Sequence, residues 1–386
     1  MTTRAAIVGV GATPFARESD ESPLALTAKA LDAAIRDAGL EPSAIDGLVV
    51  NTGSPRGVDY DIVAELLGLR VRFSSQGWGH GRFVATSVQI AALAINAGLA
   101  DVAAVVYTGK QSMLKSFGGY DYPEAFSRES GGPHGETPHQ GLTAPASGAA
   151  LALRAYLERY HTDPERLADV PLAFRAHATR NPGAIYRQPL TAADYRASPM
   201  IIDPLRRLDC APATDGAVCL LVASPDRGPS TGRPVSILGM QGIQAGREEF
   251  IFGRPGLGVQ QQTRGPFRPS SWDLAAYEQA GIDRADIAAF YTYDAFSPLV
   301  WFALERFGFC EEGAAPAFCS VQRIGPSGDL PVNTNGGMLS EGHLCGFSHL
   351  AEMVHQVRGE AGERQIEGAR LVQWGSCLGD SLILGR

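Results

Sequence analysis

The sequence predicts an α/β fold made of two related halves, and two observations support that prediction. Short apolar runs of strand length alternate with stretches of helical periodicity, which is typical of a sheet covered by helices on both faces. In addition, the pattern of residues 38–50 recurs at residues 280–292: a helix ends at a glycine, a short acidic turn follows, and an apolar strand comes next. Two copies of one α/β unit indicate halves related by a pseudo-two-fold axis.

The first half begins with a predicted buried strand at residues 5–10, followed by a helix at residues 24–38 and a second strand at residues 44–50. The helix carries its apolar side chains on one face, and Gly39 ends it. The glycines after the first strand lack the third glycine of a dinucleotide-binding loop and lead into Pro14. This departure excludes a Rossmann-type nucleotide site.

The centre of the fold is expected at residues 81–97, a helix of small apolar side chains that is uncharged apart from Arg82. A helix with almost no polar face is buried on all sides. A strand at residues 102–107 follows it, and the same order returns as a helix after Gly346 and a strand at residues 370–374. The two helix starts are therefore expected to face one pocket between the halves.

The predicted division places the N-terminal half at residues 1–230 and the C-terminal half at residues 231–386, with a Pro/Gly-rich linker at residues 225–234. Residues 111–198 interrupt the alternating pattern, because they are rich in Gly, Pro, His, Arg and Tyr and hold only short helical pieces. We interpret them as a cap or loop subdomain inserted in the first half.

Length and composition set further limits. The chain of 386 residues exceeds the usual limit of a single hydrophobic core, about 250–300 residues. A net charge of −8 without a basic block excludes nucleic acid or an anionic membrane surface as the main partner. No apolar run approaches the roughly 20 residues that span a bilayer, and no signal-peptide pattern is present. The six cysteines are scattered without a C-x-x-C pair, so we expect a cytoplasmic protein with reduced thiols.

A glycine-rich stretch at residues 333–347 is the strongest candidate site. It surrounds one imidazole, His343, and one thiol, Cys345, and an amphipathic helix follows it. Glycines let a backbone approach a ligand closely, and a helix start offers unpaired N–H groups. These residues alone fit a functional site and a glycine-rich turn with an incidental histidine equally well.

Further segments, taken together, resemble the motifs of the thiolase superfamily, which has a duplicated five-layer α/β/α/β/α fold. The four segments of the superfamily are residues 7–11, 214–217, 293–297 and 335–343. Three more are similar to the SCP2-thiolase or lipid-transfer-protein-like branch: residues 78–82, 138–143 and 339–342. The resemblance covers essentially the whole chain and implies this fold for both halves.

The departures from the thiolase pattern concern its cysteines. Thiolases carry a nucleophilic cysteine at the start of the first buried helix, and that position here falls at or beside Gly81, whereas the first cysteine of the chain is Cys210. The second thiolase cysteine falls near Gln373, and Cys377 lies a few residues later. The resemblance therefore implies that the acyl-enzyme route has lost its nucleophile unless Cys345 or Cys377 substitutes.

The branch that cleaves steroid side chains consists of CoA-thioester retro-aldolases, each paired with a small OB-fold DUF35 protein, that use two tyrosines. Tyr293 matches the first tyrosine, while His343 stands in place of the second. The resemblance implies a lyase that cleaves a β-hydroxyacyl-CoA, such as a steroid side-chain thioester, to a ketone and a short acyl-CoA. Tyr293 and His343 are its expected acid–base pair.

The residues around this pair offer further candidates. Asp294 is expected to orient the site or to take part directly, and His80 either lines the pocket or lies at the surface of a helix N-terminus. Backbone N–H groups at Gly81, Gly336 and Gly337 are the expected oxyanion site. No metal and no bound cofactor are expected, since coenzyme A arrives as part of the substrate. A homodimer and a complex with a DUF35 protein are the expected assembly.

Two other functions stay open on the sequence. One is a thiolase-like acyltransferase that uses Cys377 or Cys345, and the other is a non-catalytic acyl-CoA or lipid-binding protein. The direction of the reaction, cleavage or condensation, is open as well, because the same groups serve both.

Overall fold

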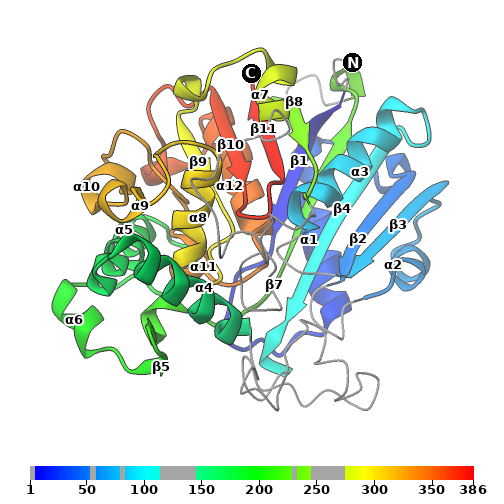
Figure 1. The fold of residues 1–386 in the computed structure, drawn as a ribbon. Coiled ribbons are helices and arrows are strands. Elements are labelled where there is room, and N and C mark those ends of the chain that lie inside the picture. Colours follow the sequence, from blue (N-terminus) through cyan, green and yellow to red (C-terminus); the bar gives the residue numbers. More distant parts are fainter. Residues whose placement is uncertain (1–4, 53–57, 79–82, 114–144, 228–232, 245–273) are drawn as a thin grey trace, which may run out of the picture.

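The computed structural model describes residues 5–52, 58–78, 83–113, 145–227, 233–244 and 274–386, and all structural statements concern these residues (Figure 1). Their centre is a nine-stranded sheet with the strand order β3-β2-β4-β7-β1-β8-β11-β10-β9. The strands are β1 (Ala6–Ala12), β2 (Gly47–Thr52), β3 (Phe73–Trp78), β4 (Val102–Lys110), β7 (Asp215–Ala223), β8 (Val235–Gln241), β9 (Ala289–Tyr291), β10 (Leu371–Gly375) and β11 (Ser381–Gly385).

The sheet repeats one pattern on either side of its middle. In the first half β2 runs parallel to β4, β4 antiparallel to β7, and β7 antiparallel to β1. In the second half β9 runs parallel to β10, β10 antiparallel to β11, and β11 antiparallel to β8. The halves join where β1 and β8 pair through Ala6 with Ser236 and Ile7 with Val235. This symmetry agrees with the predicted duplication, while the domain boundary at residue 230 stays a prediction.

The local repeat seen in the sequence is also present. Helix α1 (Pro23–Ala38) ends at Gly39 with φ 59°, and α7 (Ala275–Ala280) ends at Gly281 with φ 66°. A short 3₁₀ turn follows each helix and leads into β2 or β9. Glycine suits both ends because it adopts positive φ without a steric cost.

Helices cover the sheet in layers. Helix α1 packs on one face of β1, β4 and β7, and α7 packs on β8 and β11. Helix α3 (Val84–Asn96) packs on the face of β4 opposite to α1. Helix α12 (Phe347–Arg358) contacts strands of both halves of the sheet. Close approach requires glycine: a Cβ at Gly11 would lie 2.3 Å from Ala30 O, and one at Gly239 would lie 2.0 Å from Ala276 O. The predicted α/β class with duplicated halves is confirmed.

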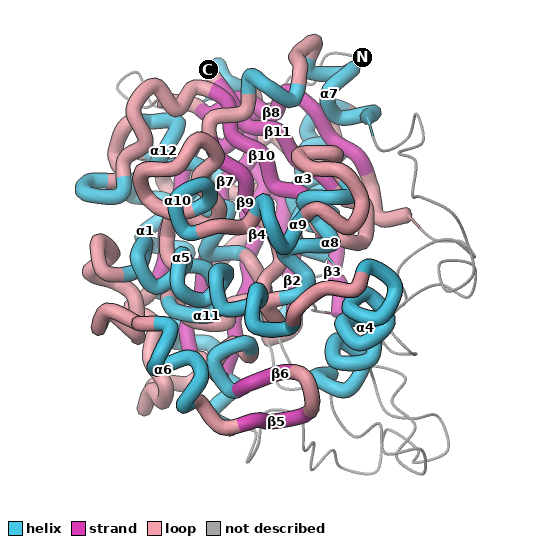
Figure 2. Tube along the Cα trace, turned by 60° about the vertical axis from the view of Figure 1, so that its left-hand side comes forward, coloured by secondary structure: helices cyan, strands magenta, loops and turns pink. Residues whose placement is uncertain are grey.

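The remaining elements lie mostly beside this core. Helices α4 (Pro145–Tyr160), α5 (Asp169–Ala178) and α6 (Ala192–Ala197) fall within the predicted cap and occupy one side of the sheet in Figure 1. Figure 2 shows α6 and the pair of strands β5 (Met200–Ile202) and β6 (Leu205–Arg206) at the end of the molecule away from both termini. The other helices are α2 (Tyr60–Leu66), α8 (Pro298–Arg306), α9 (Ala315–Phe318), α10 (Val321–Ile324) and α11 (Gly337–Ser340). In the described part of the chain, no helix has the length and apolar character needed to cross a bilayer.

Candidate active site

The predicted pair, Tyr293 and His343, meets in the interior of the molecule. Tyr293 follows β9, and His343 lies in the turn between α11 and α12. Their exposed fractions are 7% and 4%, and the Tyr293 hydroxyl lies 3.4 Å from Nε2 of His343. The two rings meet edge to face with their centroids 6.2 Å apart. The sequence separates these residues widely, but the fold places a phenol and an imidazole in one contact.

Two polar side chains hold His343 from the first half of the chain. Gln111 Nε2 lies 2.6 Å from Nδ1 of His343 and donates to the His343 carbonyl at 3.2 Å. Thr214 Oγ1 accepts from the backbone N–H of His343 at 2.9 Å. The backbone N–H of Thr214 in turn donates to Gln111 Oε1 at 3.1 Å. The imidazole is therefore held from both its ring and its backbone.

Burial sets the charge of this site. It lowers the pKa of His343 to about 4, despite the opposing effect of Asp294, so the imidazole is neutral at pH 7. Tyr107, fully buried on β4, donates to Cys345 Sγ at 3.1 Å and stacks on Phe347 with ring centroids 4.9 Å apart. Burial, and then Cys345, raise the pKa of Tyr107 well above its usual value of 10.

Asp294 makes backbone and histidine contacts beside the pair. Its carboxylate accepts from the N–H groups of Met338 at 3.0 Å and Leu339 at 3.2 Å, at the start of α11. It also lies 2.8 Å from Nε2 of His349. These contacts anchor the stretch that leads to His343, which is a structural task.

Gly336 and Gly337 differ from the prediction of an oxyanion site. The N–H of Gly336 donates to Asn333 O at 2.8 Å, and that of Gly337 donates to Asn335 Oδ1 at 3.3 Å. Both groups are thus engaged within the turn. Gly337 is needed for a different reason: at its φ of 65° a Cβ would lie 2.3 Å from the Asp294 carboxylate. His80 and Gly81 lie outside the described residues.

A second buried polar network supports α12. Asn335 contacts Nδ1 of His349 at 2.9 Å and also donates to the carboxylate of Glu341. Asn181 donates to the same carboxylate at 2.8 Å. Burial raises the pKa of Glu341 to about 7. The sequence pattern marks Asn335 and Glu341 only as members of the glycine-rich stretch, and it does not mark Asn181.

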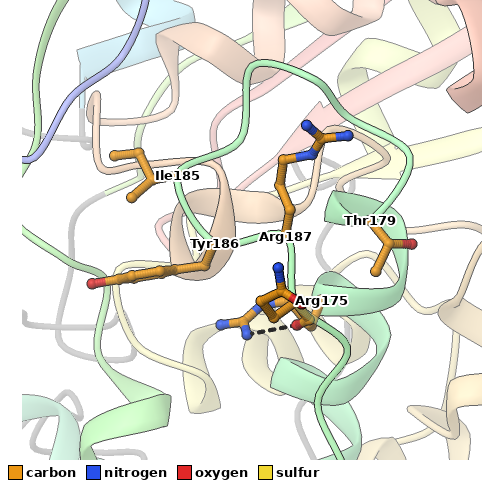
Figure 3. Close-up of a pocket in the computed structure, with 6 residues that line it drawn as sticks. Arg175, Thr179, Ile185, Tyr186 and Arg187 are labelled. Atoms are coloured by element: carbon orange, nitrogen blue, oxygen red, sulfur yellow. Dashed lines mark hydrogen bonds between the residues drawn. The ribbon is translucent and has the colours of Figure 1, made fainter.

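A separate pocket of about 570 Å³ lies in the cap. Figure 3 shows its lining residues, with Arg175 donating to the Gln188 carbonyl at 3.1 Å and Arg187 directed away from Arg175. Arg175 also donates to Ser340 Oγ at 3.0 Å, so the pocket adjoins α11. Neither member of the Tyr293–His343 pair lines it. The described residues contain no group of three or more His, Cys, Asp or Glu arranged to hold a metal ion.

Comparison with known proteins decides the family. Residues 263–378 match the thiolase C-terminal domain-like family. The chain is 33% identical over 367 residues to a steroid side-chain-cleaving aldolase of Thermomonospora curvata, covering 92% of this chain and 90% of that protein. It is 35% identical over 366 residues to the 17-hydroxy-3-oxo-4-pregnene-20-carboxyl-CoA lyase of Mycobacterium tuberculosis, covering 93% and 92%. This chain belongs to the thiolase superfamily.

Solved structures agree with that placement. The Ltp2-ChsH2(DUF35) aldolase superposes with a TM-score of 0.86 at 31% identity, covering 100% of this chain and 98% of that chain. A monomeric SCP2-thiolase-like protein from Mycobacterium smegmatis shares the fold, with a TM-score of 0.68 at 20% identity. The predicted branch of the thiolase superfamily is confirmed. The predicted enzyme class is confirmed as well, because the two relatives above are named as an aldolase and a lyase.

The two thiols considered as nucleophiles, those of Cys377 and Cys345, are poorly suited to nucleophilic attack. Cys377 lies buried in the β10–β11 turn, where burial raises its pKa to about 12. Cys345 is buried as well and accepts the hydrogen bond from Tyr107. All six cysteines lie in the described residues, and none forms a disulfide. A buried thiol of raised pKa holds almost no thiolate at pH 7.

Sequence reasoning missed three site residues. Tyr107 ends a predicted strand and Gln111 begins the predicted cap, and no local pattern marks either as a site residue. Thr214 begins one of the superfamily segments, which was a usable signal. The register of β4 with β7 brings this part of the site together, since Lys110 pairs with Asp215.

Proposed function

We propose that this protein is a carbon–carbon lyase that cleaves a β-hydroxyacyl-CoA thioester by a retro-aldol reaction, with a steroid side-chain thioester as the substrate class. One observation carries the proposal: a buried tyrosine and a neutral histidine are in contact in the interior of the molecule. The class of the substrate comes from the two relatives, whose names give steroid side chains and a pregnene carboxyl-CoA thioester.

The reaction balances without a redox partner. The β-hydroxyl group loses its proton, the C–O bond becomes a carbonyl, and the bond between the α and β carbons breaks. Its electron pair passes to the thioester as an enolate, which takes a proton at carbon. The products are a ketone and a shortened acyl-CoA, and the number of protons is unchanged. Catalysis therefore needs only proton transfer and hydrogen bonds to the developing enolate.

Tyr293 and His343 are the groups that we propose for this task. The phenol is a donor with a pKa ordinarily near 10, and the neutral imidazole can donate at one nitrogen while accepting at the other. Both are shielded from water, which strengthens their hydrogen bonds to a substrate oxygen. We propose no bound cofactor, since coenzyme A enters and leaves as part of substrate and product.

The acyltransferase alternative is less well supported. It requires an ionised thiol at the reacting centre, yet burial raises the pKa of Cys377, and the Cys345 thiol already accepts from a buried tyrosine. A non-catalytic lipid binder would have no use for a neutral histidine held by three hydrogen-bonding contacts.

We propose further that the protein works as a homodimer in complex with a small DUF35 protein. The structural relative with a TM-score of 0.86 is itself an aldolase that includes a DUF35 component. Coexpression with candidate DUF35 proteins, followed by size-exclusion chromatography with light scattering, tests both parts of this assembly.

The decisive experiment supplies the purified complex with a tertiary β-hydroxyacyl-CoA that carries a steroid ring system, and with a non-steroid analogue. Mass spectrometry then follows the ketone and the shortened acyl-CoA. Appearance of both products in equal amounts is the expected result. Absence of turnover on every thioester tested, with the complex intact, contradicts the proposed function.

A further inference from the structure

We propose that Gln111 is a positioning residue that fixes the tautomer of His343, so that Nδ1 carries the lone pair and Nε2 carries the proton. His343 then meets Tyr293 as a hydrogen-bond donor. Only the catalytic consequence rests on the proposed function; the tautomer itself is a property of the resting protein.

The orientation of the Gln111 amide is set by two backbone groups. Its oxygen accepts from the N–H of Thr214 at 3.1 Å, and its nitrogen donates to the carbonyl of His343 at 3.2 Å. The reversed amide would place its NH₂ against an N–H donor and its oxygen against a carbonyl oxygen. Both contacts would be repulsive, so only one orientation satisfies the backbone.

That orientation determines the state of the imidazole. The Gln111 NH₂ group lies 2.6 Å from Nδ1 of His343, and an NH₂ group only donates. Nδ1 must therefore be the acceptor, and in a neutral ring the proton is then on Nε2. Nε2 is the nitrogen that lies 3.4 Å from the Tyr293 hydroxyl.

Gln111 is itself held by its neighbours in the chain. Lys110 forms an ion pair with Asp215 at 2.7 Å, and Ser112 donates to the same carboxylate from its backbone N–H at 2.9 Å and from its hydroxyl at 2.5 Å. Asp215 follows Thr214, the residue that binds Gln111 and His343. The end of β4 is thus clamped to the start of β7 on both sides of the amide, which leaves Gln111 little freedom to turn.

The consequence concerns the direction of proton transfer. A His343 that is protonated at Nε2 cannot take a proton there, so it does not act as a base toward Tyr293 or the substrate from this nitrogen. Its N–H donates toward the Tyr293 oxygen, and the Tyr293 proton is then available for a substrate oxygen or carbon. In the resting enzyme the pair is a donor that favours the enolate. The β-hydroxyl proton then passes to a water molecule, and water returns a proton to Tyr293 after Tyr293 has protonated the enolate, so the number of protons is unchanged.

The direct test is ¹⁵N NMR of the full-length protein labelled at histidine, at pH 7. The signals of His343 are assigned by their loss in His343→Gln. We expect the pattern of a neutral imidazole with its proton on Nε2. A ring protonated at Nδ1, or a doubly protonated ring, would overturn the proposal, whether or not any lyase activity is found.

Two substitutions then test the cause. Gln111→Met keeps the side-chain length but removes the donor, so we expect the Nε2–H signature to weaken and kcat to fall about 10- to 100-fold. Gln111→Glu presents an acceptor to Nδ1, so we expect the proton to move to Nδ1. If the tautomer of His343 is unchanged in both variants, a group other than Gln111 fixes it, and the proposal is wrong.

A matched control separates this effect from lost packing. Gln89 is another buried glutamine, whose NH₂ group donates to the carbonyls of Gln241 at 2.8 Å and Ser381 at 3.2 Å, without contact to either member of the pair. Gln89→Met should lower the melting temperature while leaving the His343 signals and kcat as they are. Should a Gln111 variant fail to fold, the spectrum of the unsubstituted protein still decides the tautomer.

Discussion

His343 and His349 lie close together in the chain and are both buried, yet their partners differ in kind. His343 is held by an amide, a threonine hydroxyl and a tyrosine, all of them neutral. His349 is held by the carboxylate of Asp294, with the amide of Asn335 on its other nitrogen. A histidine tied to a carboxylate is fixed as part of the scaffold, whereas one tied to neutral groups keeps a nitrogen directed at the reacting partner.

The comparison explains why one stretch carries both stability and chemistry. Asp294 follows Tyr293 directly, so the segment after β9 that supplies the phenol also supplies the carboxylate that anchors α11. Movement of either histidine would disturb the other through this segment. The variants below separate the two roles, beginning with the largest expected effect.

Tyr293→Phe should produce the largest loss of activity. Removing the phenol takes away the hydroxyl that lies against Nε2 of His343 and donates to the substrate, and we expect kcat to fall about 10²- to 10⁴-fold. Tyr277→Phe is the matched control. Tyr277 lies in α7, and its hydroxyl donates to the side chain of Gln373 at 2.6 Å. Steady-state kinetics on both proteins measure the contrast. Equal losses in the two variants would mean that the Tyr293 hydroxyl has no special part.

Asp294→Asn should instead reduce stability. The new NH₂ group would meet an N–H that now donates to a carboxylate oxygen, and His349 would lose its charged partner. We expect the free energy of unfolding to fall by about 2–4 kcal/mol, as measured by urea denaturation. The folded fraction should keep kcat within about tenfold. If the variant keeps normal stability but loses its activity, Asp294 has a role in the reaction rather than in the scaffold.

The sequence predicted the fold, and it singled out His343 but not His349. Apolar runs and the repeat at residues 38–50 predicted the duplicated sheet, and the resemblance predicted Tyr293 and His343. The sequence did not reveal Gln111, because only the long-range pairing of β4 with β7 brings it beside Thr214. Gly336 was misjudged for a related reason: a glycine-rich stretch does not show which acceptors its N–H groups already have.

The acid sensitivity of the protein should depend on His343. Burial lowers its pKa to about 4 in the folded state, against about 6.5 in the unfolded chain. Between these pH values the unfolded state binds the extra proton, so the contribution of this residue is present above pH 6.5 and is lost as the pH falls toward 4. The loss is roughly 3 kcal/mol.

His343→Gln removes this contribution, which makes the difference between two proteins the useful quantity. Other buried groups, such as His177 with a pKa lowered to about 4 and Glu341 with one raised to about 7, titrate in both proteins and cancel. Urea denaturation from pH 7 to pH 4 should show the unsubstituted protein losing more free energy of unfolding than the variant. Parallel curves would mean that His343 accepts a proton in the folded state as readily as in the unfolded chain.

Cys377→Ala should have the smallest effect, and it tests whether the chemistry has left the thiols. Because burial raises the pKa of this thiol to about 12, only about one molecule in 10⁵ would hold a thiolate at pH 7. We therefore expect kcat to stay within about threefold, and intact-protein mass spectrometry after exposure to acyl-CoA to show no acyl adduct. Cys219→Ala, at a fully buried thiol in β7, controls for the loss of packing. The opposite outcome is an acyl adduct that disappears in Cys377→Ala together with the activity. It would mean that the protein uses the acyl-enzyme chemistry of thiolases, with the Tyr293–His343 contact as part of that route.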